Sequence, residues 1–263
     1  MTIPSSGGEQ RGQVGARDVA SAWQRLIAAK ATQPFLTYHD DTTGERVELS
    51  YATFGNWLSK TANLVQDDLL AGPGDRIAVS ARPHWLTAVW LVAPLFAGAV
   101  VDPWGEAKAA HTVVAGPDES VLAAARECPG ERLALSLLPL GRPFDVVPDG
   151  FRDYSAEVRA FADRSVSFNP PRPDMDALVL DGKTVTHGEL VELVERDAAA
   201  DPGTVDRVLV DARQDLFTGD ELLRWLFGPL LTGASIVLVR GAGPQRLDRI
   251  AEMERVTRRL TLG

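Results

Sequence analysis

Hydrophobic and polar positions follow two periods along this chain, and the two periods divide it into helices and strands. Apolar residues from Val19 to Ile27 recur every three or four positions, the spacing that places them on one face of a helix. Short apolar runs bounded by Gly, Pro or Asp predict strands instead. The expected elements are, in order, helix 18–31, strands 34–39 and 46–50, a helix from Ser50 to the Gly72-Pro73-Gly74 turn, strand 76–80, helix 84–97, strands 99–101 and 112–115, helix 118–127, strand 132–137, a short helix 154–163, strand 177–180, helix 186–199, strand 207–210, helix 220–231, strand 235–239 and helix 245–260.

Strands that alternate with helices of this length indicate βαβ units, so the predicted fold class is α/β with two doubly wound lobes and mainly parallel sheets. Six prolines between Leu138 and Asp176 mark that span as a surface connection, because proline removes hydrogen-bond donors and restricts its neighbours. The predicted domains are a tail at 1–17, a first α/β lobe at 18–140, a Pro-rich connection with a short helix at 141–175, and a second, incomplete lobe at 176–263. The tail is expected to be disordered, because it is rich in Gly, Ser, Gln and Arg and has no apolar run.

Composition narrows the possible partners. The 263 residues are 45% apolar and carry a formal net charge of −9 with dispersed Lys and Arg, which argues against nucleic acid as a partner. The uncharged run 85–101 is too short for a membrane span and contains Pro94 and Gly98, so a buried helix and strand are expected there. The single cysteine, Cys128, fits a reducing compartment, and we expect a cytoplasmic protein.

Three blocks of sequence resemble the adenylate-forming superfamily of acyl-CoA synthetases, peptide-synthetase adenylation domains and luciferases. They are Leu49-Ser50-Tyr51-Ala52-Thr53-Phe54; Gly72-Pro73-Gly74-Asp75-Arg76-Ile77-Ala78-Val79, which runs on to Ala97-Gly98-Ala99-Val100-Val101-Asp102-Pro103; and Val185-Thr186-His187-Gly188-Glu189-Leu190, supported by the Gly233-Ala234 strand entry and Glu254-Arg255-Val256-Thr257. Singly each block is weak, but in this order they cover about residues 20–257. The resemblance implies the fold of the N-terminal domain and an ancestral activity, ATP-dependent ligation of a carboxylic acid to a thiol.

The residues that this chemistry requires depart from the family pattern. The family's phosphate loop of small residues should lie just before Val185, where this chain offers only Asp181-Gly182-Lys183-Thr184. Such a loop lays backbone N–H groups around phosphates, and Asp181 would repel them. The family motif whose glutamate holds Mg²⁺ follows a tyrosine, but Tyr38, Tyr51 and Tyr154 are followed by His, Ala and Ser.

The short segment from Asp181 to Val185 is therefore interpreted as a plain strand-to-helix turn, with Gly182 easing the bend. Thr186 reads as the N-cap of the next helix with Glu189 at the capping-box position. Lys183, Thr184, Thr186 and His187 are the candidate residues of a remnant anion or nucleotide site at that helix N-terminus. No catalytic residue, metal ligand or cofactor is predicted. Aromatic residues near Asp102, including Trp104, could line a cleft, although core packing is the default for them.

These features favour a truncated, stand-alone relative of the adenylate-forming enzymes that is a non-catalytic pseudoenzyme. Two alternatives from other classes stay open. The chain could be a ligand-binding protein for an acyl group, a nucleotide or CoA, or an interaction module that docks an unknown protein partner or a second copy. A further possibility is an enzyme half that a partner chain completes.

Overall fold

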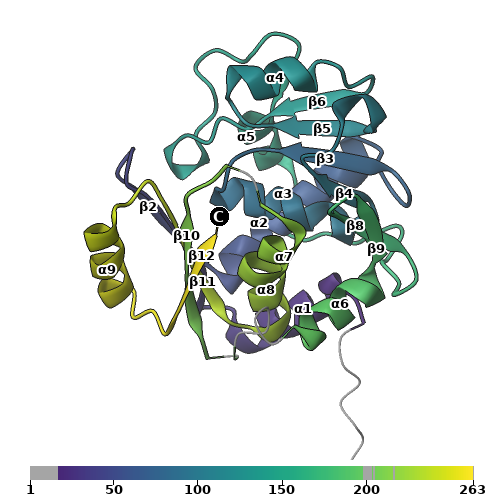
Figure 1. Ribbon diagram of the computed structural model, residues 1–263. Helices are drawn as coiled ribbons and strands as arrows, with labels where there is room; N and C mark the ends of the chain where they lie inside the picture. The colour runs from purple at the N-terminus through teal and green to yellow at the C-terminus, as the bar shows by residue number, and fades with distance from the viewer. Residues whose placement is uncertain (1–16, 198–202, 204, 216, 263) are drawn as a thin grey trace, which may run out of the picture.

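The computed structural model describes residues 17–197, 203, 205–215 and 217–262, so the predicted tail at 1–17 lies outside the described residues except for Arg17. Figure 1 shows the course of the chain. In the first half the elements are α1 (Val19–Lys30), β1 (Pro34–Asp40), β2 (Glu45–Ser50), α2 (Tyr51–Asn63) continued by a π-helical turn (Leu64–Asp68), β3 (Arg76–Ser80), α3 (Trp85–Phe96), β4 (Val100–Pro103), β5 (Thr112–Ala115), α4 (Glu119–Ala125) and β6 (Glu131–Ala134). In the second half they are β7 (Arg152–Asp153), α5 (Tyr154–Glu157), β8 (Asp176–Leu180), β9 (Lys183–Thr186), α6 (His187–Arg196), β10 (Arg207–Ala212), α7 (Gly219–Leu222) continued by a π-helical turn (Leu223–Phe227) into α8 (Gly228–Thr232), β11 (Ser235–Arg240), α9 (Pro244–Met253) and β12 (Arg258–Leu262).

The strands form two mixed sheets that are mainly parallel, which confirms the predicted fold class. One sheet has the order β12-β10-β11-β1-β2 and the other β7-β6-β5-β3-β4-β8-β9. Only the hairpin strands β2 and β9 run antiparallel to their neighbours, each at a sheet edge among the described strands. Strands from both sides of the Pro-rich connection contribute to each sheet, because β1 pairs with β11 and β4 with β8.

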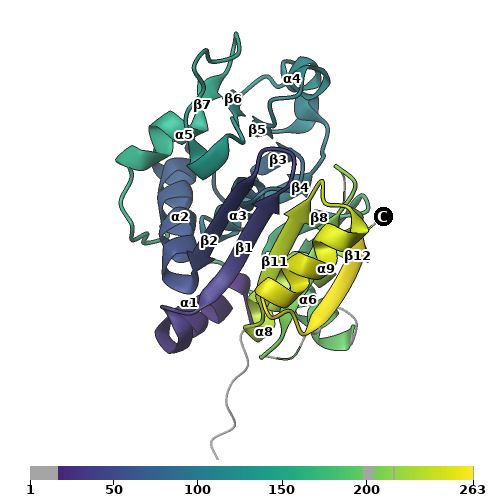
Figure 2. The ribbon, with the colours of Figure 1, turned by 90° about the vertical axis from the view of Figure 1, so that its left-hand side faces the viewer.

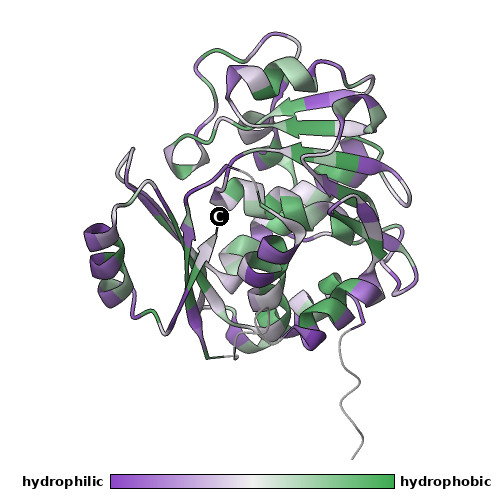
Figure 3. Cartoon of the chain, viewed as in Figure 1, coloured by the Kyte–Doolittle hydropathy of each residue, from purple (hydrophilic) through white to green (hydrophobic). Residues whose placement is uncertain are grey.

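Period-two alternation in the strands explains the layers. In β11, Ile236 and Leu238 join the large central core, whereas Val237 and Val239 pack with Leu247 of α9 on the opposite face. The larger sheet behaves likewise, since Val114 of β5 joins the central core while Val113 and Ala115 pack with α4. The two sheets thus enclose a helical layer, with α9 covering the outside of one sheet and α4 the outside of the other (Figures 1 and 2). The hydropathy colouring follows this arrangement, with green inner faces and a purple outer face on α9 (Figure 3).

Local sequence explains where the helices begin. Asp18, Ser50 and Thr186 each accept a backbone N–H at the first turn of α1, α2 and α6, and the Thr186–Glu189 capping box is present as predicted. His84 performs the same role for α3, where its Nδ1 accepts the Leu86 N–H at 3.1 Å. Most of the predicted helices and strands are confirmed within a few residues.

The prediction of a plain strand-to-helix turn at 181–185 was wrong. Residues 183–186 form β9, which pairs antiparallel with β8. Asp181 and Gly182 have φ values of 47° and 79° and make the two-residue turn of a hairpin. An Asp-Gly pair is favoured there because the turn needs positive φ at both positions. The prediction was wrong because Gly182 was taken as a bend before a helix, whereas the pair Asp181-Gly182 is the signal of a hairpin turn.

The predicted helix over 245–260 was too long. It ends at Met253, and residues 258–262 instead form β12, parallel to β10. Arg255 takes a φ of 52°, which a continuing right-handed helix does not allow. The short strand β7 was not predicted at all, because two residues carry no readable periodicity.

Candidate functional site

The carboxyl ends of the larger sheet meet at a reversal of strand order. β3 has β4 on one side and β5 on the other. The helices that follow lie on opposite faces, since α3 belongs to the central core whereas Leu122 and Ala125 of α4 pack with the other face of β3 and β5. In open α/β sheets such a switch point leaves a crevice at the carboxyl ends of the strands, where ligands bind.

The loop after β4 fills the centre of this edge. Trp104 takes a φ of 58°, in the left-handed region that non-glycine residues rarely occupy, and its N–H donates to the Val79 carbonyl at 2.9 Å. Gly105 allows its backbone to lie close to the Asp102 side chain, because a Cβ at position 105 would lie 2.3 Å from Cγ of Asp102. The Asp102 carboxylate in turn accepts from Nη1 of Arg76 at 3.0 Å. Backbone and side-chain bonds therefore hold the indole of Trp104 at the edge.

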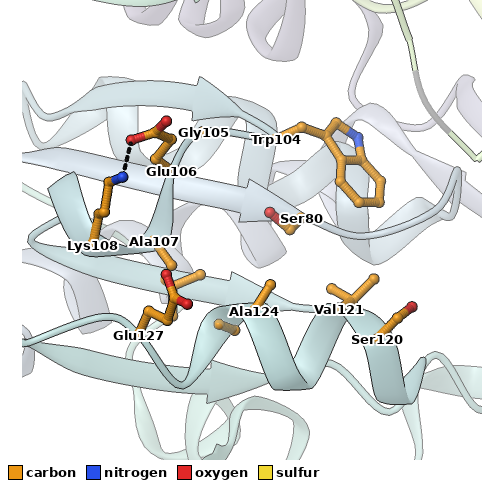
Figure 4. Close-up of a pocket in the computed structure, with 12 residues that line it drawn as sticks. Ser80, Trp104, Gly105, Glu106, Ala107, Lys108, Ser120, Val121, Ala124 and Glu127 are labelled. Carbon is orange, nitrogen blue, oxygen red and sulfur yellow. Dashed lines mark ion pairs between the residues drawn. The ribbon is translucent and has the colours of Figure 1, made fainter.

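Trp104 separates two pockets. The first, with a volume of about 390 Å³, lies between the ends of β3 and β4 and helix α4. Figure 4 shows Trp104 at one end of it, Ser80 in the middle, and the ion pair of Lys108 with Glu106 (3.2 Å) at the other. Its floor consists of small side chains of α4, including Ala124.

The second pocket, which we call the Asp181 pocket, lies on the other side of Trp104 and has a volume of about 340 Å³. The ends of β4 and β8 and the start of α7 form it. Side chains that line it include Asp102, Trp104, Leu180, Asp181 and Phe217. It occupies the edge where the resemblance places the phosphate loop.

A carboxylate occupies the helix N-terminus at this pocket. Oδ1 of Asp181 accepts the backbone N–H of Gly219, the first residue of α7, at 3.0 Å. Thr218 and Glu221 form a capping box on the same turn, in which the Thr218 hydroxyl accepts the Glu221 N–H at 3.3 Å. Two of the donors that could bind an anion, the N–H groups of Gly219 and Glu221, are thus already bonded within the chain.

The structure does not gather the predicted remnant anion residues around one point. Lys183 and Thr184 are exposed on β9, at the sheet edge. Thr186 is half-buried, and its hydroxyl accepts the Glu189 N–H at 3.2 Å. Anion binding by these residues stays a prediction.

His187, the last of these candidates, is fully buried at the start of α6. Neither ring nitrogen has a hydrogen-bond partner among the described residues. Burial lowers the pKa of His187 to about 4, against the opposing effect of Asp18. The ring is therefore neutral at pH 7 and packs as a core side chain.

A second polar cluster lies on the other sheet. Glu254 is 7% exposed and accepts from Nε2 of His39 (2.9 Å), Nε of Arg46 (2.9 Å) and Nη2 of Arg207 (2.7 Å). Although burial opposes the effect, these donors lower the pKa of Glu254 to about 2. These bonds join the end of α9 to β1, β2 and β10, so the cluster has a structural role.

The sequence predicted core packing as the default for Trp104, with a cleft as the alternative, and identified Asp181 as a charge that repels phosphate, but Phe217 and Gly219 were missed. Those residues lie about forty positions from Asp181, and only the packing of α7 against β8 brings them together. Within the described part of the chain no group of three or more His, Cys, Asp or Glu could hold a metal ion. In the same part, every helix is too short or too polar to cross a membrane.

Comparison with known proteins identifies a relative that is similar over most of the chain. No family model matches the chain. It is 38% identical over 243 residues to a Mycobacterium tuberculosis protein named as a TIGR03089 family protein, covering 89% of this chain and 93% of the relative.

Solved structures share the fold at low identity. An acyl-CoA synthetase of Brucella canis matches with a TM-score of 0.72 and 18% identity over 96% of this chain and 48% of that one. The N-terminal domain of FACL13 from Mycobacterium tuberculosis matches with a TM-score of 0.66 and 14% identity, over 91% and 61% of the two chains. A benzoate CoA ligase of Burkholderia xenovorans matches with a TM-score of 0.66 and 20% identity, over 89% and 47%. The chain thus spans about half the length of the Brucella and Burkholderia enzymes and 61% of the FACL13 domain, and it has the fold of the N-terminal part.

Proposed function

The chain belongs to the TIGR03089 family, and from that premise we propose that it is a non-catalytic member of the adenylate-forming fold, one that does not activate carboxylic acids with ATP. The activity of adenylate-forming enzymes is attack of a carboxylate on the α-phosphate of ATP. That reaction needs donors, and usually a metal ion, to absorb the charge of the polyphosphate.

The Asp181 carboxylate is the observation that carries this proposal. It accepts the Gly219 N–H at the edge where the resemblance places the phosphate loop. The hairpin between β8 and β9 has only Asp181 and Gly182 in its turn, so no length of backbone is free to wrap a triphosphate. A carboxylate in that position would also repel phosphate oxygens.

The test is ATP–pyrophosphate exchange with the full-length protein, Mg²⁺ and a panel of short, long and aromatic carboxylic acids. An acyl-CoA synthetase assayed beside it serves as the positive control. We expect exchange at the level of the protein-free blank for every acid. Exchange above the blank that depends on a particular acid and is abolished by heat denaturation would contradict the proposal.

Exposed apolar side chains support an interaction module as a second candidate. Val166 and Phe168 in the Pro-rich connection are 78% and 73% exposed, and the neighbouring Leu70 is 75% exposed. Gln66 links these segments, because its side chain bonds the Val166 carbonyl and the Phe168 N–H. Phe168→Ser should lower self-association in light scattering if a second copy covers this patch, and an unchanged molar mass would count against it.

A further inference from the structure

The Asp181 pocket has the size and walls of a small-molecule site. Its volume of about 340 Å³ falls within the roughly 300–1,000 Å³ of ordinary ligand pockets. Trp104 and Phe217 supply aromatic walls from two separate segments, and Leu180 adds an aliphatic one. Both rings are only half-buried, so they present apolar surface to whatever enters the pocket.

The charges around the pocket leave one carboxylate uncompensated. Asp102 pairs at 3.0 Å with Arg76, which also lines the pocket, and Glu106 pairs at 3.2 Å with Lys108. Asp181 accepts a backbone N–H but has no ion-pair partner in the described part of the chain. A ligand that enters therefore meets a negative charge beside two aromatic rings.

Backbone conformation and hydrogen bonds fix the positions of Trp104 and Asp181 in the absence of a ligand. Trp104 and Asp181 both hold positive φ values, of 58° and 47°. A bulky residue such as Trp104 rarely adopts this conformation, and its N–H bond to the Val79 carbonyl helps to maintain it. The Asp-Gly hairpin turn itself favours positive φ at Asp181, and the bond to the Gly219 N–H fixes the direction of its carboxylate.

We propose that the Asp181 pocket binds a small organic cation, a primary ammonium group carried on an aromatic or similarly flat apolar body. The ammonium lies against the free oxygen of Asp181, and the apolar body lies between Trp104 and Phe217. Aromatic faces attract cations as well as apolar groups, and a carboxylate selects the charged form over neutral analogues. An anion of the same shape is rejected by the same carboxylate.

Binding of an amine in this pocket does not depend on whether the protein lacks ATP-dependent activity. Asp181 takes part in both proposals, but each proposal predicts a different measurement. Failure of amine binding leaves the exchange result unchanged, and exchange activity with some acid would not by itself supply or remove a cation site.

The experiment uses three probes of one shape: phenethylamine, 2-phenylethanol and phenylacetate, titrated into the full-length protein and followed by protein-observed NMR at pH 7. We expect phenethylamine to bind about tenfold or more tightly than 2-phenylethanol, with affinity falling as salt rises, and phenylacetate to show no saturable binding. Shifted resonances should include the Trp104 indole N–H and the Gly219 amide. Equal affinity for amine and alcohol, or tighter binding of the acid, would overturn the proposal.

Substitutions locate the site. Asp181→Asn keeps an acceptor for Gly219 and should reduce phenethylamine affinity to that of 2-phenylethanol while leaving the alcohol unaffected. Trp104→Gly suits the positive φ and should weaken both probes. If the Trp104→Gly protein does not fold, Phe217→Leu replaces it as the variant that removes an aromatic wall and should weaken both probes. Asp174→Asn, an exposed carboxylate outside the pocket, is the matched control and should bind as wild type does. Unchanged amine affinity in the Asp181→Asn protein contradicts the proposal.

Discussion

The Asp181 carboxylate accepts the backbone N–H of Gly219 at 3.0 Å, and this bond joins the β8–β9 turn to the first residue of α7. The approach is close, because a Cβ on Gly219 would lie 2.7 Å from the other carboxylate oxygen. The Asp181 side chain thus stabilises the hairpin and the start of α7 through this bond, and it also adds a negative charge to the pocket. Substitutions can separate its contribution to stability from its contribution to charge.

Asp181→Ala should destabilise the fold more than Asp181→Gly does. Alanine loses the bond to Gly219 and must also hold a φ of 47°, which costs a non-glycine residue about 1 kcal/mol or more. Glycine loses the same bond but adopts that φ freely. Urea unfolding should place Asp181→Ala about 1–2 kcal/mol below Asp181→Gly.

Asp181→Asn is the control for this series, because asparagine accepts the Gly219 N–H and tolerates positive φ. Its free energy of unfolding should lie within about 0.5 kcal/mol of wild type. Equal stabilities for the Ala and Gly variants would show that the turn conformation contributes nothing.

A buried hydroxyl pair ties the Pro-rich connection to the first helices. Thr61 of α2 and Tyr154 of α5 are both fully buried, and their hydroxyls lie 2.6 Å apart. Tyr154→Phe should cost about 1–2 kcal/mol, because it leaves the Thr61 hydroxyl buried without this partner. The double variant Thr61→Val and Tyr154→Phe should recover part of that loss, as measured in a double-mutant cycle. Strict additivity of the two single changes would argue that the hydroxyls do not interact.

Glu254 should be the most costly carboxylate to neutralise. Glu254→Gln keeps the size of the side chain but leaves Arg207 and His39 without their charged acceptor, so we expect a loss of about 2–4 kcal/mol at pH 7. Glu48→Gln is the control, because the side chains of Glu48 and Arg46 are 38% and 48% exposed, and their ion pair should contribute less than about 1 kcal/mol. Similar losses in the two variants would mean that burial of Glu254 adds nothing.

The Glu254 carboxylate should also make the free energy of unfolding fall at acid pH. The folded pKa of Glu254, about 2, lies below its ordinary value of 4.5, so the unfolded chain binds the proton first. Its stabilisation is complete above pH 4.5 and is lost as the pH falls toward 2. Chemical denaturation between these values should show a shallower fall for Glu254→Gln than for wild type.

Local pattern predicted most helices and strands here because each core-facing run, such as that of α1, carries its own period. Pattern failed where the structure depends on distant residues. The segment 258–262 becomes a strand because β10 lies beside it, and nothing in its five residues requires that. The Asp181 pocket is a similar case, since Asp181 was recognisable as a charge but Phe217 and Gly219 reach it only through α7. The hairpin turn differs, because its Asp-Gly signal was local and readable.

His187 should make the protein sensitive to mild acid. Burial lowers its folded pKa to about 4 from an ordinary value of 6.5, so the unfolded state takes up the proton first as the pH falls. Stability contributed by the neutral ring is therefore present above pH 6.5 and declines between pH 6.5 and 4, by about 2 kcal/mol at pH 5. His187→Leu removes both unpartnered nitrogens and should flatten this part of the curve, with equal or greater stability than wild type at pH 7. His187→Gln also cannot titrate, so it should be flat as well, but its buried amide should lower stability at every pH. Guanidinium unfolding at half-unit steps from pH 7 to 4.5 separates these outcomes, and a wild-type slope retained in the Leu variant would assign the acid sensitivity to other groups, such as the buried His39 and His84, whose pKa values burial also lowers.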